Sequence, residues 1–365
     1  MVKTVSKNIV AEYLPFLEYI PQSLIIKDGA PYFIEFEYPT DEEIILDGEN
    51  IKDVFKERID PYGDHSTLIS QRRSLRPQPD LADDTYKISD SCLFDDKSRI
   101  ASPQEEYKDL GVFSAPNPFA FNPGFHDLII TEDHVETIDQ IKESHIYGII
   151  SALKIRAQKM KTDHDIDQLD MGINFGTDKL KYPSGASQPH LHAQIGAVFK
   201  NGFMPIQDKV QYINDQFKGL SIDYEELYIQ ALKSSALIAW ENNSFYAITP
   251  FAPRFKDEIN IISKNKNIPN IISTTEKDIK DLSEIIYKSI KALENLSVPD
   301  KDGREVNVGI KSFNIDFLGL RFERIEGRMI IYILPRQTEI AYSELLGRFV
   351  IDRSPEETAR YIKYE

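Results

Sequence analysis

The feature that most constrains the fold is a strand, helix, strand order that occurs twice along the chain. The first set of elements is expected at residues 126–131 (strand), 135–160 (helix), 171–175 (strand) and 190–199 (strand). The second set is expected about 130 residues later, at residues 245–250 and 257–263 (strands), 274–296 (helix), and 306–313 and 328–334 (strands). This repetition predicts an internal duplication, with sheet and helices in each half.

Capping signals support two of the helices. Thr275 and Asp278 are spaced like a capping box at the start of the helix expected at 274–296. A further helix is expected at 354–364, where Ser354 can act as the N-cap, Pro355 occupies the first helical position and Glu357 follows three residues after the cap. The predicted fold class is therefore α+β.

Composition excludes several classes of function. With 365 residues, 41% of them hydrophobic, the chain can build two domains or one large duplicated one. A formal net charge of -16 argues against an extended surface for nucleic acid or anionic membrane, so an anionic ligand needs a local basic pocket. No run of about 18 apolar residues occurs. Cys92 is the single cysteine, which excludes an internal disulfide and makes a cytoplasmic location the expectation.

The segment SGASQPHLHAQIGA (184–197) holds two of the seven histidines, His190 and His192, followed by Gln194. Residues two apart on a strand face the same side, so the three side chains are expected in one site, which suggests a metal or a phosphate. A neutral imidazole is a good nucleophile toward phosphorus. Gln194 can donate a side-chain N–H, and the turn with Gly185 and Ser187 can bring further donors close. A partly buried polar strand or a bare metal pair would also explain the pattern.

Several segments together resemble the galactose-1-phosphate uridylyltransferase family, the transferase branch of the histidine triad superfamily. GASQPHLHAQI (185–195) resembles its active-site pattern Gly-x-Ser-x-Pro-His-Pro-His-x-Gln. Other segments match the family in order: STLISQRRSLRP (66–77), DSCLFD (90–95), GVFSAPNPFAF (111–121), HDLIITEDH (126–134), MGINFG (171–176), AITPFAPRFKDEINIISK (247–264) and ILPRQTEIAYSELLGRFVIDRSPEETARYI (333–362). The resemblance covers about residues 60 to 365. It implies duplicated histidine-triad-like units with antiparallel sheets and packed helices.

The resemblance implies an amino-terminal extension at 1–60, a catalytic half at 61–205 and a second half at 206–365 that lacks its own histidine motif. It makes His192 the nucleophile that forms a nucleotidyl-imidazole, and Gln194 the residue that binds the transferring phosphoryl group. The implied substrate-binding residues are Arg73, Arg76, Asn117, Phe119, Asn174, Gly185 and Ser187. For the two arginines, a solvated basic turn is the alternative.

The same resemblance implies a structural zinc ion beside the nucleophile strand. The ligand positions of the family fall on Cys92, Asp95, His134 and His190, with Asp95 where the family has a cysteine. A carboxylate can ligate zinc, so this set is chemically reasonable. The alternative is a site held by hydrogen bonds alone. Since no histidine follows His192, a second histidine-based metal site is excluded. Leu191 also departs from the family's proline.

The implied reaction moves a nucleoside monophosphate, UMP by resemblance, between a nucleoside-diphosphate sugar and a sugar 1-phosphate through a covalent nucleotidyl-histidine. A sugar-nucleotide or dinucleoside polyphosphate phosphorylase that uses inorganic phosphate is the alternative, and a catalytically silent nucleotide-binding module is a third reading. A hydrolase is disfavoured because position 194 is Gln rather than His. The expected partners are a nucleotide sugar, a sugar phosphate or phosphate, and a second copy of the chain in a homodimer, without nucleic acid or membrane.

Overall fold

The structure is a computed structural model that describes residues 92–120, 125–164, 166–176, 184–186, 188–199, 205–221, 223–300, 302–337 and 353–362. It also describes the backbone of seven short strands, β1 (Ile25–Lys27), β2 (Ala30–Tyr32), β3 (Glu35–Pro39), β4 (Ile44–Leu46), β5 (Glu49–Ile51), β6 (Val54–Ile59) and β7 (Ser66–Ile69). These strands pair as β1–β2, β4–β5 and β3–β6–β7.

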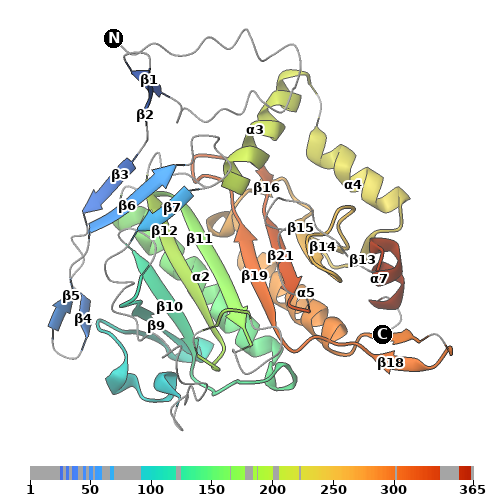
Figure 1. The fold of residues 1–365 in the computed structure, drawn as a ribbon, viewed down its shortest axis with the longest axis horizontal. Helices are drawn as coiled ribbons and strands as arrows, with labels where there is room; N and C mark the ends of the chain where they lie inside the picture. Colours follow the sequence, from blue (N-terminus) through green and yellow to red (C-terminus); the bar gives the residue numbers. More distant parts are fainter. Residues whose placement is uncertain are drawn as a thin grey trace.

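A ten-stranded antiparallel sheet forms the centre of the molecule (Figure 1). From one edge to the other, its strands are β13 (Ile238–Glu241), β14 (Phe245–Ile248), β15 (Ile259–Ser263), β21 (Ile330–Pro335), β19 (Phe313–Leu318), β11 (Ile166–Phe175), β12 (His192–Phe199), β10 (His126–Thr131), β9 (Val112–Pro116) and β8 (Glu105–Tyr107). Each half contributes five strands, and from its outer edge inward they follow the same order along the chain: first, second, third, fifth and fourth. The two halves meet where β19 pairs with β11. The predicted duplication and α+β class are confirmed, with the strands of both halves joined in one sheet.

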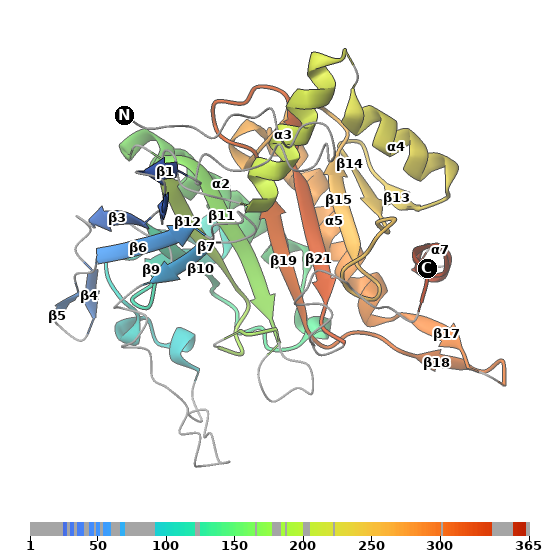
Figure 2. The same cartoon turned by 45° about the horizontal axis from the view of Figure 1, so that its top comes forward.

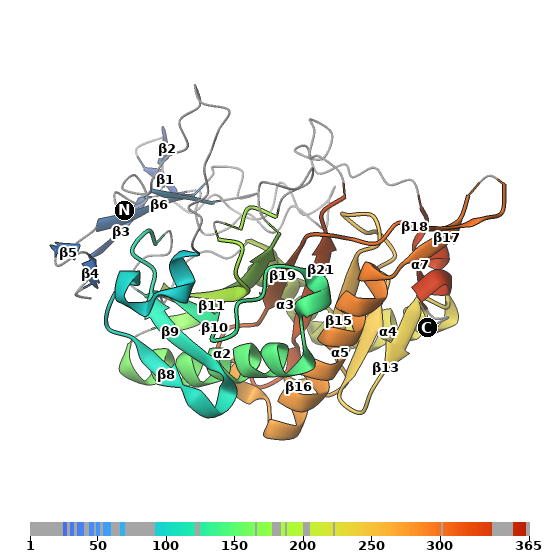
Figure 3. The same ribbon diagram turned by 90° about the horizontal axis from the view of Figure 1, so that it is seen from below.

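Two long helices cover one face of this sheet. α2 (Glu143–Asp163) belongs to the first half and α5 (Glu276–Glu294) to the second, and they lie on the same side of the sheet (Figure 3). Their apolar residues, including Ile149, Leu153, Leu282 and Ile286, are buried in one large core with the helix-facing side chains of the strands. Burial of this apolar surface is the main force that holds the two halves together.

The helix starts differ in how well the sequence predicted them. For α5, the capping box is confirmed: Thr275 N–H donates to the Asp278 carboxylate at 2.8 Å, and Asp278 N–H donates to Thr275 Oγ1 at 3.2 Å. α2 begins at Glu143, so the helix predicted from residue 135 was wrong over its first eight positions. There the Gln140 side chain accepts from the N–H groups of Glu136 and Thr137, which closes the short 3-10 turn η5 (Ile138–Gln140) instead.

Two predicted strands have different bounds in the structure. β12 starts at His192 rather than at 190, because Leu191 bonds to the loop after β10: its N–H donates to Val135 O at 2.9 Å. The strand predicted at 306–313 was wrong. Residues Glu305–Asn307 form β18, which pairs with β17 (Ser297–Pro299) in a hairpin that projects from the body (Figure 2). Val308 and Ile310 then donate to carbonyls at the end of α5, and the sheet strand β19 begins only at Phe313.

The remaining elements are short or peripheral. They are the 3-10 helices η2 (Leu93–Asp95), η3 (Lys97–Arg99), η4 (Lys108–Leu110) and η6 (Ile271–Ser273), the parallel pair β16 (Asn267–Ile268) and β20 (Gly327–Arg328), and the helices α3 (Pro205–Gly219), α4 (Tyr224–Ser234) and α7 (Pro355–Ile362). The predicted C-terminal helix is confirmed as α7. Arg353 and Thr358 both bond to the buried carboxylate of Asp257, at 2.8 Å each. Within the described ranges, no helix is long and apolar enough to cross a membrane.

The second face of the sheet carries the site. At one end, Phe94 of η2 packs on Leu128 and Ile130 in a small apolar cluster. At the other end, residues of α4 pack on Ile248 and Ile262 in a second cluster. Between these clusters, polar side chains gather on the same face of β12, β11, β19 and β21: His192, Gln194, Asn174, Asn314, Asp316 and Tyr332. This polar strip lies between two apolar clusters of the same sheet face, as expected of a binding site.

Candidate active site

His192 occupies the first position of β12, and its ring has a defined proton arrangement. Its Nδ1 lies 2.7 Å from the backbone carbonyl oxygen of His190. A carbonyl oxygen only accepts, so Nδ1 carries the hydrogen and donates it, which leaves the lone pair on Nε2. This is the tautomer that a nucleophilic histidine requires.

The surroundings keep this ring neutral. The His192 side chain is 1% exposed, and the ring of Phe94 packs against it edge-on with centroids 5.0 Å apart. Burial lowers the pKa of His192 to about 4, although the bond to the His190 carbonyl opposes the shift. Nε2 therefore carries no proton at neutral pH, and its lone pair is available. Because the ring is so little exposed, a substrate has to open a path to it.

Gln194 lies two residues along the same strand, on the same face as His192. Its Oε1 is 3.0 Å from Nε2 of His126, a buried histidine at the start of β10. Gly196, which has no side chain, is the cross-strand partner of His126 and leaves room for this contact. Asn117 Nδ2 lies 3.5 Å from the same His126 nitrogen. His126, Gln194 and Asn117 thus form one polar group beside the nucleophile.

Asn174 lies beside His192 on the neighbouring strand, because Ile173 is the cross-strand partner of Ala193. The side-chain N–H of Asn314, on β19 of the second half, donates to Asn174 Oδ1 and also to Ser184 O at 2.9 Å. Ser184 begins the turn before the histidine pair, and its hydroxyl donates to Gly176 O at 2.7 Å. The next residue, Gly185, has φ of 83°, a left-handed conformation that favours glycine.

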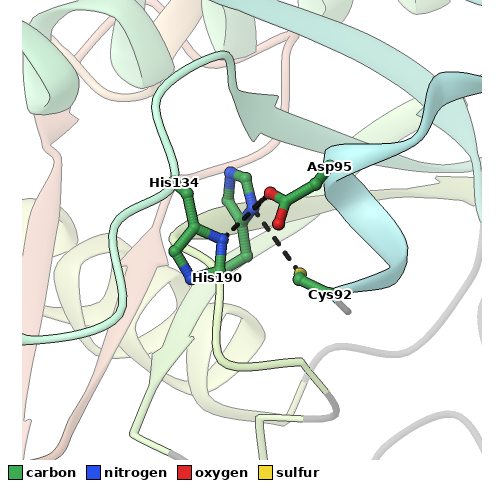
Figure 4. Close-up of side chains that lie close together, drawn as sticks. All are labelled: Cys92, Asp95, His134 and His190. Carbon is green, nitrogen blue, oxygen red and sulfur yellow. Dashed lines mark hydrogen bonds and ion pairs between the residues drawn. The ribbon is translucent and has the colours of Figure 1, made fainter. Parts of the chain in front are cut away.

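Cys92, Asp95, His134 and His190 come together next to this site (Figure 4). One ligand atom from each residue lies within 4.8 Å of the other three. His190 Nδ1 is 3.7 Å from Cys92 Sγ and 3.2 Å from Asp95 Oδ1, and His134 Nδ1 is 2.9 Å from the same Asp95 oxygen. The predicted metal ligands are therefore one cluster, although they come from three separate segments of the chain.

The donor set fits a zinc ion. The Nε2 of His190 lies 2.8 Å from Thr131 O, which requires a hydrogen on Nε2 and turns the lone pair of Nδ1 toward the cluster. This lone pair faces an Asp95 oxygen, which is also a hydrogen-bond acceptor. A hydrogen on Nδ1 would make the ring an imidazolium ion, and burial opposes this because it lowers the pKa of His190. A bound cation would attract both the lone pair and the carboxylate oxygen. Ligand separations of about 3.3–3.8 Å are expected around tetrahedral zinc. The contacts of 2.9, 3.2 and 3.7 Å lie around this range and all four ligand atoms are within 4.8 Å of one another, so the cluster has the size of a metal site.

A second layer of contacts holds the loop that carries His134. The carboxylate of Asp133 lies 3.1 Å from His145 Nε2 and 3.4 Å from Lys142 Nζ. His145 is buried at the start of α2, so the loop is fixed to the helix layer. These contacts hold the residue that precedes His134.

The structure brings together most of the predicted site residues. Asn117 is buried and accepts the N–H of Phe119 at 2.9 Å through Oδ1, while Phe119 itself is half-buried. Arg73, Arg76 and Ser187 lie outside the described residues. Sequence reasoning missed His126 and Asn314. The only available signal for each was a polar residue in an apolar strand pattern, and their partners are 68 and 140 residues away.

Comparison with solved structures identifies the fold. A uridylyltransferase matches with a TM-score of 0.64 and 18% identity, over 84% of this chain and 97% of that one. ADP-glucose phosphorylase from Arabidopsis thaliana, solved with bound ADP-glucose, matches with a TM-score of 0.58 and 17% identity, over 85% of this chain and 98% of that one. A galt-like protein from Arabidopsis thaliana matches with a TM-score of 0.56 and 18% identity, over 70% and 84% of the two chains.

Sequence comparison gives a different result: no protein-family model matches the chain, and a search of curated proteins finds no match. At 17–18% identity, the structural likeness shows the fold alone. The chain therefore has the fold of the GalT-like uridylyltransferases and of ADP-glucose phosphorylase, as the order of its sequence motifs predicted.

Proposed function

We propose that this protein is a nucleotidyltransferase that moves a nucleoside monophosphate, UMP in the first instance, from a nucleoside-diphosphate sugar to a sugar 1-phosphate. The observation that carries the proposal is the 2.7 Å contact of His192 Nδ1 with the His190 carbonyl, which leaves Nε2 as a free nucleophile. The fold shared with a uridylyltransferase supports the assignment.

In the first step, Nε2 of His192 attacks the α-phosphorus of the nucleotide sugar. A P–N bond forms, the bond to the bridging oxygen breaks, and the sugar 1-phosphate leaves with that electron pair. The ring then has substituents on both nitrogens and carries a positive charge. The His190 carbonyl, already bonded to Nδ1–H, stabilises that charge as it develops.

In the second step, a phosphate oxygen of the acceptor attacks the same phosphorus and restores the lone pair of Nε2. Both leaving groups are weak bases, so catalysis is mainly a matter of position and charge neutralisation. The side-chain amides of Gln194 and Asn174 would donate to the phosphoryl oxygens. Arg73, Arg76, Gly185 and Ser187 would bind the phosphates, and Asn117 with Phe119 would line the nucleoside pocket.

The metal cluster would have a structural role. Cys92, Asp95, His134 and His190 would hold a zinc ion, whose bonds fix the loops that carry its ligands. With one thiolate and one carboxylate, the ligand set carries two negative charges and balances the charge of the ion. The residue that gains most from this constraint is His190, because its backbone carbonyl orients the nucleophile.

A phosphorylase is the second candidate, favoured by the fold shared with ADP-glucose phosphorylase. Its first step would be the same, and inorganic phosphate would replace the sugar 1-phosphate in the second. A nucleotide-binding module without turnover is a third candidate. It would bind the same ligands and form no covalent bond.

The test is to incubate the protein with UDP-, ADP-, GDP- and CDP-glucose and to weigh it intact under denaturing conditions. We expect a mass gain of one nucleoside monophosphate from one of the four, on the peptide that contains His192. The isolated adduct is then offered glucose 1-phosphate, galactose 1-phosphate or inorganic phosphate. Release by a sugar phosphate supports the transferase, and release by inorganic phosphate alone supports the phosphorylase. If no sugar nucleotide labels the protein, the covalent mechanism is wrong.

A further inference from the structure

Two side-chain amides flank the nucleophile, one on its own strand and one on the next. Gln194 lies two residues after His192 on β12, and Asn174 lies beside His192 on β11. An amide has a donor end and an acceptor end of nearly the same shape, so its effect on a phosphoryl oxygen depends on its orientation. Only the NH2 end stabilises an anionic phosphoryl group.

The orientation of Asn174 is determined by a backbone carbonyl. Asn314 makes two contacts through Nδ2, one with Ser184 O at 2.9 Å and one with Asn174 Oδ1. Ser184 O can only accept, so the end of Asn314 that faces both groups is its NH2. Asn174 must then accept through its oxygen, and its own NH2 lies at the opposite end of the amide.

Gln194 has the equivalent arrangement with a different partner. Its Oε1 lies 3.0 Å from His126 Nε2 in a buried setting, which requires a hydrogen on that nitrogen. The Asn117 amide nitrogen is at 3.5 Å from the same atom, the longer and weaker contact. With its oxygen bonded to His126, Gln194 also keeps its NH2 end free.

We propose that Asn314 and His126 are positioning residues for nucleotidyl transfer: Asn314 binds the oxygen of Asn174, and His126, in the tautomer with a hydrogen on Nε2, binds the oxygen of Gln194, so that both NH2 groups are directed at the phosphoryl group on His192. This inference rests on the proposed function. It also gives the second half of the chain, which has no histidine motif, a defined part in the active site through Asn314.

Fixed orientation has a direct energetic benefit. Donors that already face the developing charge need no reorganisation during the reaction, and the loss of one such donor typically slows the chemical step by about 100- to 1000-fold. A positioning residue acts indirectly: when it is lost, the flanking amide turns its oxygen toward the phosphoryl group in only part of the protein molecules. We therefore expect losses of about 10- to 100-fold for Asn314 and His126.

The first experiment is a double-mutant cycle on Asn314 and Asn174. The single-turnover rate of His192 labelling by UDP-glucose, or by whichever sugar nucleotide labels the protein, is measured for Asn314→Leu, Asn174→Ala and the double variant. Leucine is close in shape to asparagine, has no NH2 to donate and adds no charge. We expect Asn314→Leu to slow labelling about 10- to 100-fold in the wild-type background and about twofold or less in Asn174→Ala. Equal losses in both backgrounds overturn the proposal.

The second cycle pairs His126 with Gln194. We expect His126→Leu to slow labelling about 10- to 100-fold alone and about twofold or less in Gln194→Ala. His126→Gln, whose terminal amide can donate from a similar position, should restore most of the rate. Thermal melting of each variant establishes that it folds. A His126→Gln variant that folds and labels as slowly as His126→Leu contradicts the positioning role.

A readout independent of activity separates this inference from the proposed function. In ¹⁵N NMR spectra, a protonated imidazole nitrogen differs clearly from one with a lone pair, and His126→Gln identifies the signal among the seven histidines. We expect a hydrogen on Nε2 of His126. If Nε2 has none, Gln194 presents its oxygen and the inference is wrong even where labelling occurs. If Nε2 is protonated and no sugar nucleotide labels the protein, the proposed function fails and the orientation of Gln194 stands.

Discussion

The backbone carbonyl of His190 accepts the Nδ1–H of His192 at 2.7 Å, while the His190 side chain belongs to the candidate metal cluster. His190 thus links the candidate metal cluster to the ring of His192. The side chain anchors residue 190 to Cys92 and Asp95, and the anchored backbone fixes the tautomer of the neighbouring ring. The strand pattern predicted both imidazoles in one site; in the structure only His192 lies on β12, while His190 precedes the strand with its ring in the candidate metal cluster and its carbonyl on His192 Nδ1.

The first prediction concerns the nucleophile. His192→Gly should abolish formation of the nucleotidyl adduct, because the protein then has no lone pair next to Gln194 and Asn174. Mass spectrometry of the intact, denatured protein measures this. His164→Asn is the matched control: His164 stacks on Phe125 with ring centroids 3.5 Å apart, outside the group around His192, and its loss should leave labelling in place. Full transfer activity in His192→Gly would show that another group is the nucleophile.

A second prediction addresses Asp95, the member of the candidate metal cluster that departs from the family pattern. Asp95→Cys should keep the metal, since the charge of the ligand set is unchanged, whereas Asp95→Ala should lose most of it. Elemental analysis by mass spectrometry gives the metal content per chain. Loss of the ion should also lower the stability of the folded state by about 2–4 kcal/mol, as for any ligand that binds only the native protein well above its Kd. Full metal content in Asp95→Ala would show that Asp95 is not a ligand of the metal.

The fold was predictable because its signals are local. The apolar period of α5, its Thr275 cap and the alternation of β10 are each contained in a short stretch of sequence. The start of α2 failed because Gln140 bonds back to the chain, a side-chain choice that competes with helix formation. The strand expected at 306–313 failed because the backbone N–H groups of Val308 and Ile310 bond to the carbonyls of Leu296 and Leu293 at and after the end of α5 rather than to a sheet strand.

The site was predictable only at residues that belong to a sequence motif. The histidine pair and Gln194 were singled out by their spacing on a strand and by the family resemblance, and the four candidate metal ligands by the resemblance; the structure places those four in one cluster and Gln194 on β12 with His192. Asn314 and His126 contact partners that are close in space and remote in sequence. These contacts depend on the antiparallel register of β10 with β12 and of β11 with β19, which no local pattern specifies.

A third prediction concerns the support of β10 from the helix layer. Arg156 of α2 donates through Nε to the buried carboxylate of Asp127 at 2.9 Å and through Nη1 to Glu105 at 2.9 Å. Burial raises the pKa of Asp127, although Arg156 opposes the shift. Arg156→Met would leave a buried carboxylate without its partner, so we expect a loss of about 3–5 kcal/mol in the free energy of unfolding, measured with urea.

Two variants act as controls for the Arg156 prediction. Asp127→Leu in the Arg156→Met background removes the unpaired carboxylate and should recover part of the stability. Lys159→Met removes a surface contact with Glu105 of 3.0 Å and should cost less than about 1 kcal/mol. If Arg156→Met is no more costly than Lys159→Met, the pair does not stabilise β10.

The fourth prediction concerns the pH dependence of stability. Asp316 of β19 is exposed, yet its carboxyl lies among the groups of the polar strip, and this partial desolvation, with Asp170 nearby, raises its pKa to about 6 although Arg254 opposes the shift. A carboxyl with a raised pKa destabilises the fold once it ionises, so its cost develops as the pH rises from about 4 to about 6 and persists above that. Asp316→Asn should therefore be more stable than the wild type, by more at pH ~7.5 than at pH ~4.5. The gain should be about 1 kcal/mol, because water still reaches the residue and screens its charge.

The opposite sign is expected at Asp278, which makes it the matched control. Its pKa is lowered even though burial opposes the shift, because Thr275 bonds to the carboxylate at the start of α5. A carboxyl with a lowered pKa stabilises the fold when ionised, and this contribution is lost as the pH falls. Asp278→Asn should thus lower the melting temperature by about the same amount at pH ~7.5 and pH ~4.5, since both lie above the ordinary carboxyl pKa of 3.8, and by less only at pH ~2.5. Asp316→Asn, in contrast, raises the melting temperature most at pH ~7.5. Melting curves of both variants at the three pH values decide the question: a pH-independent difference for Asp316→Asn would mean that its charge does not act on the fold.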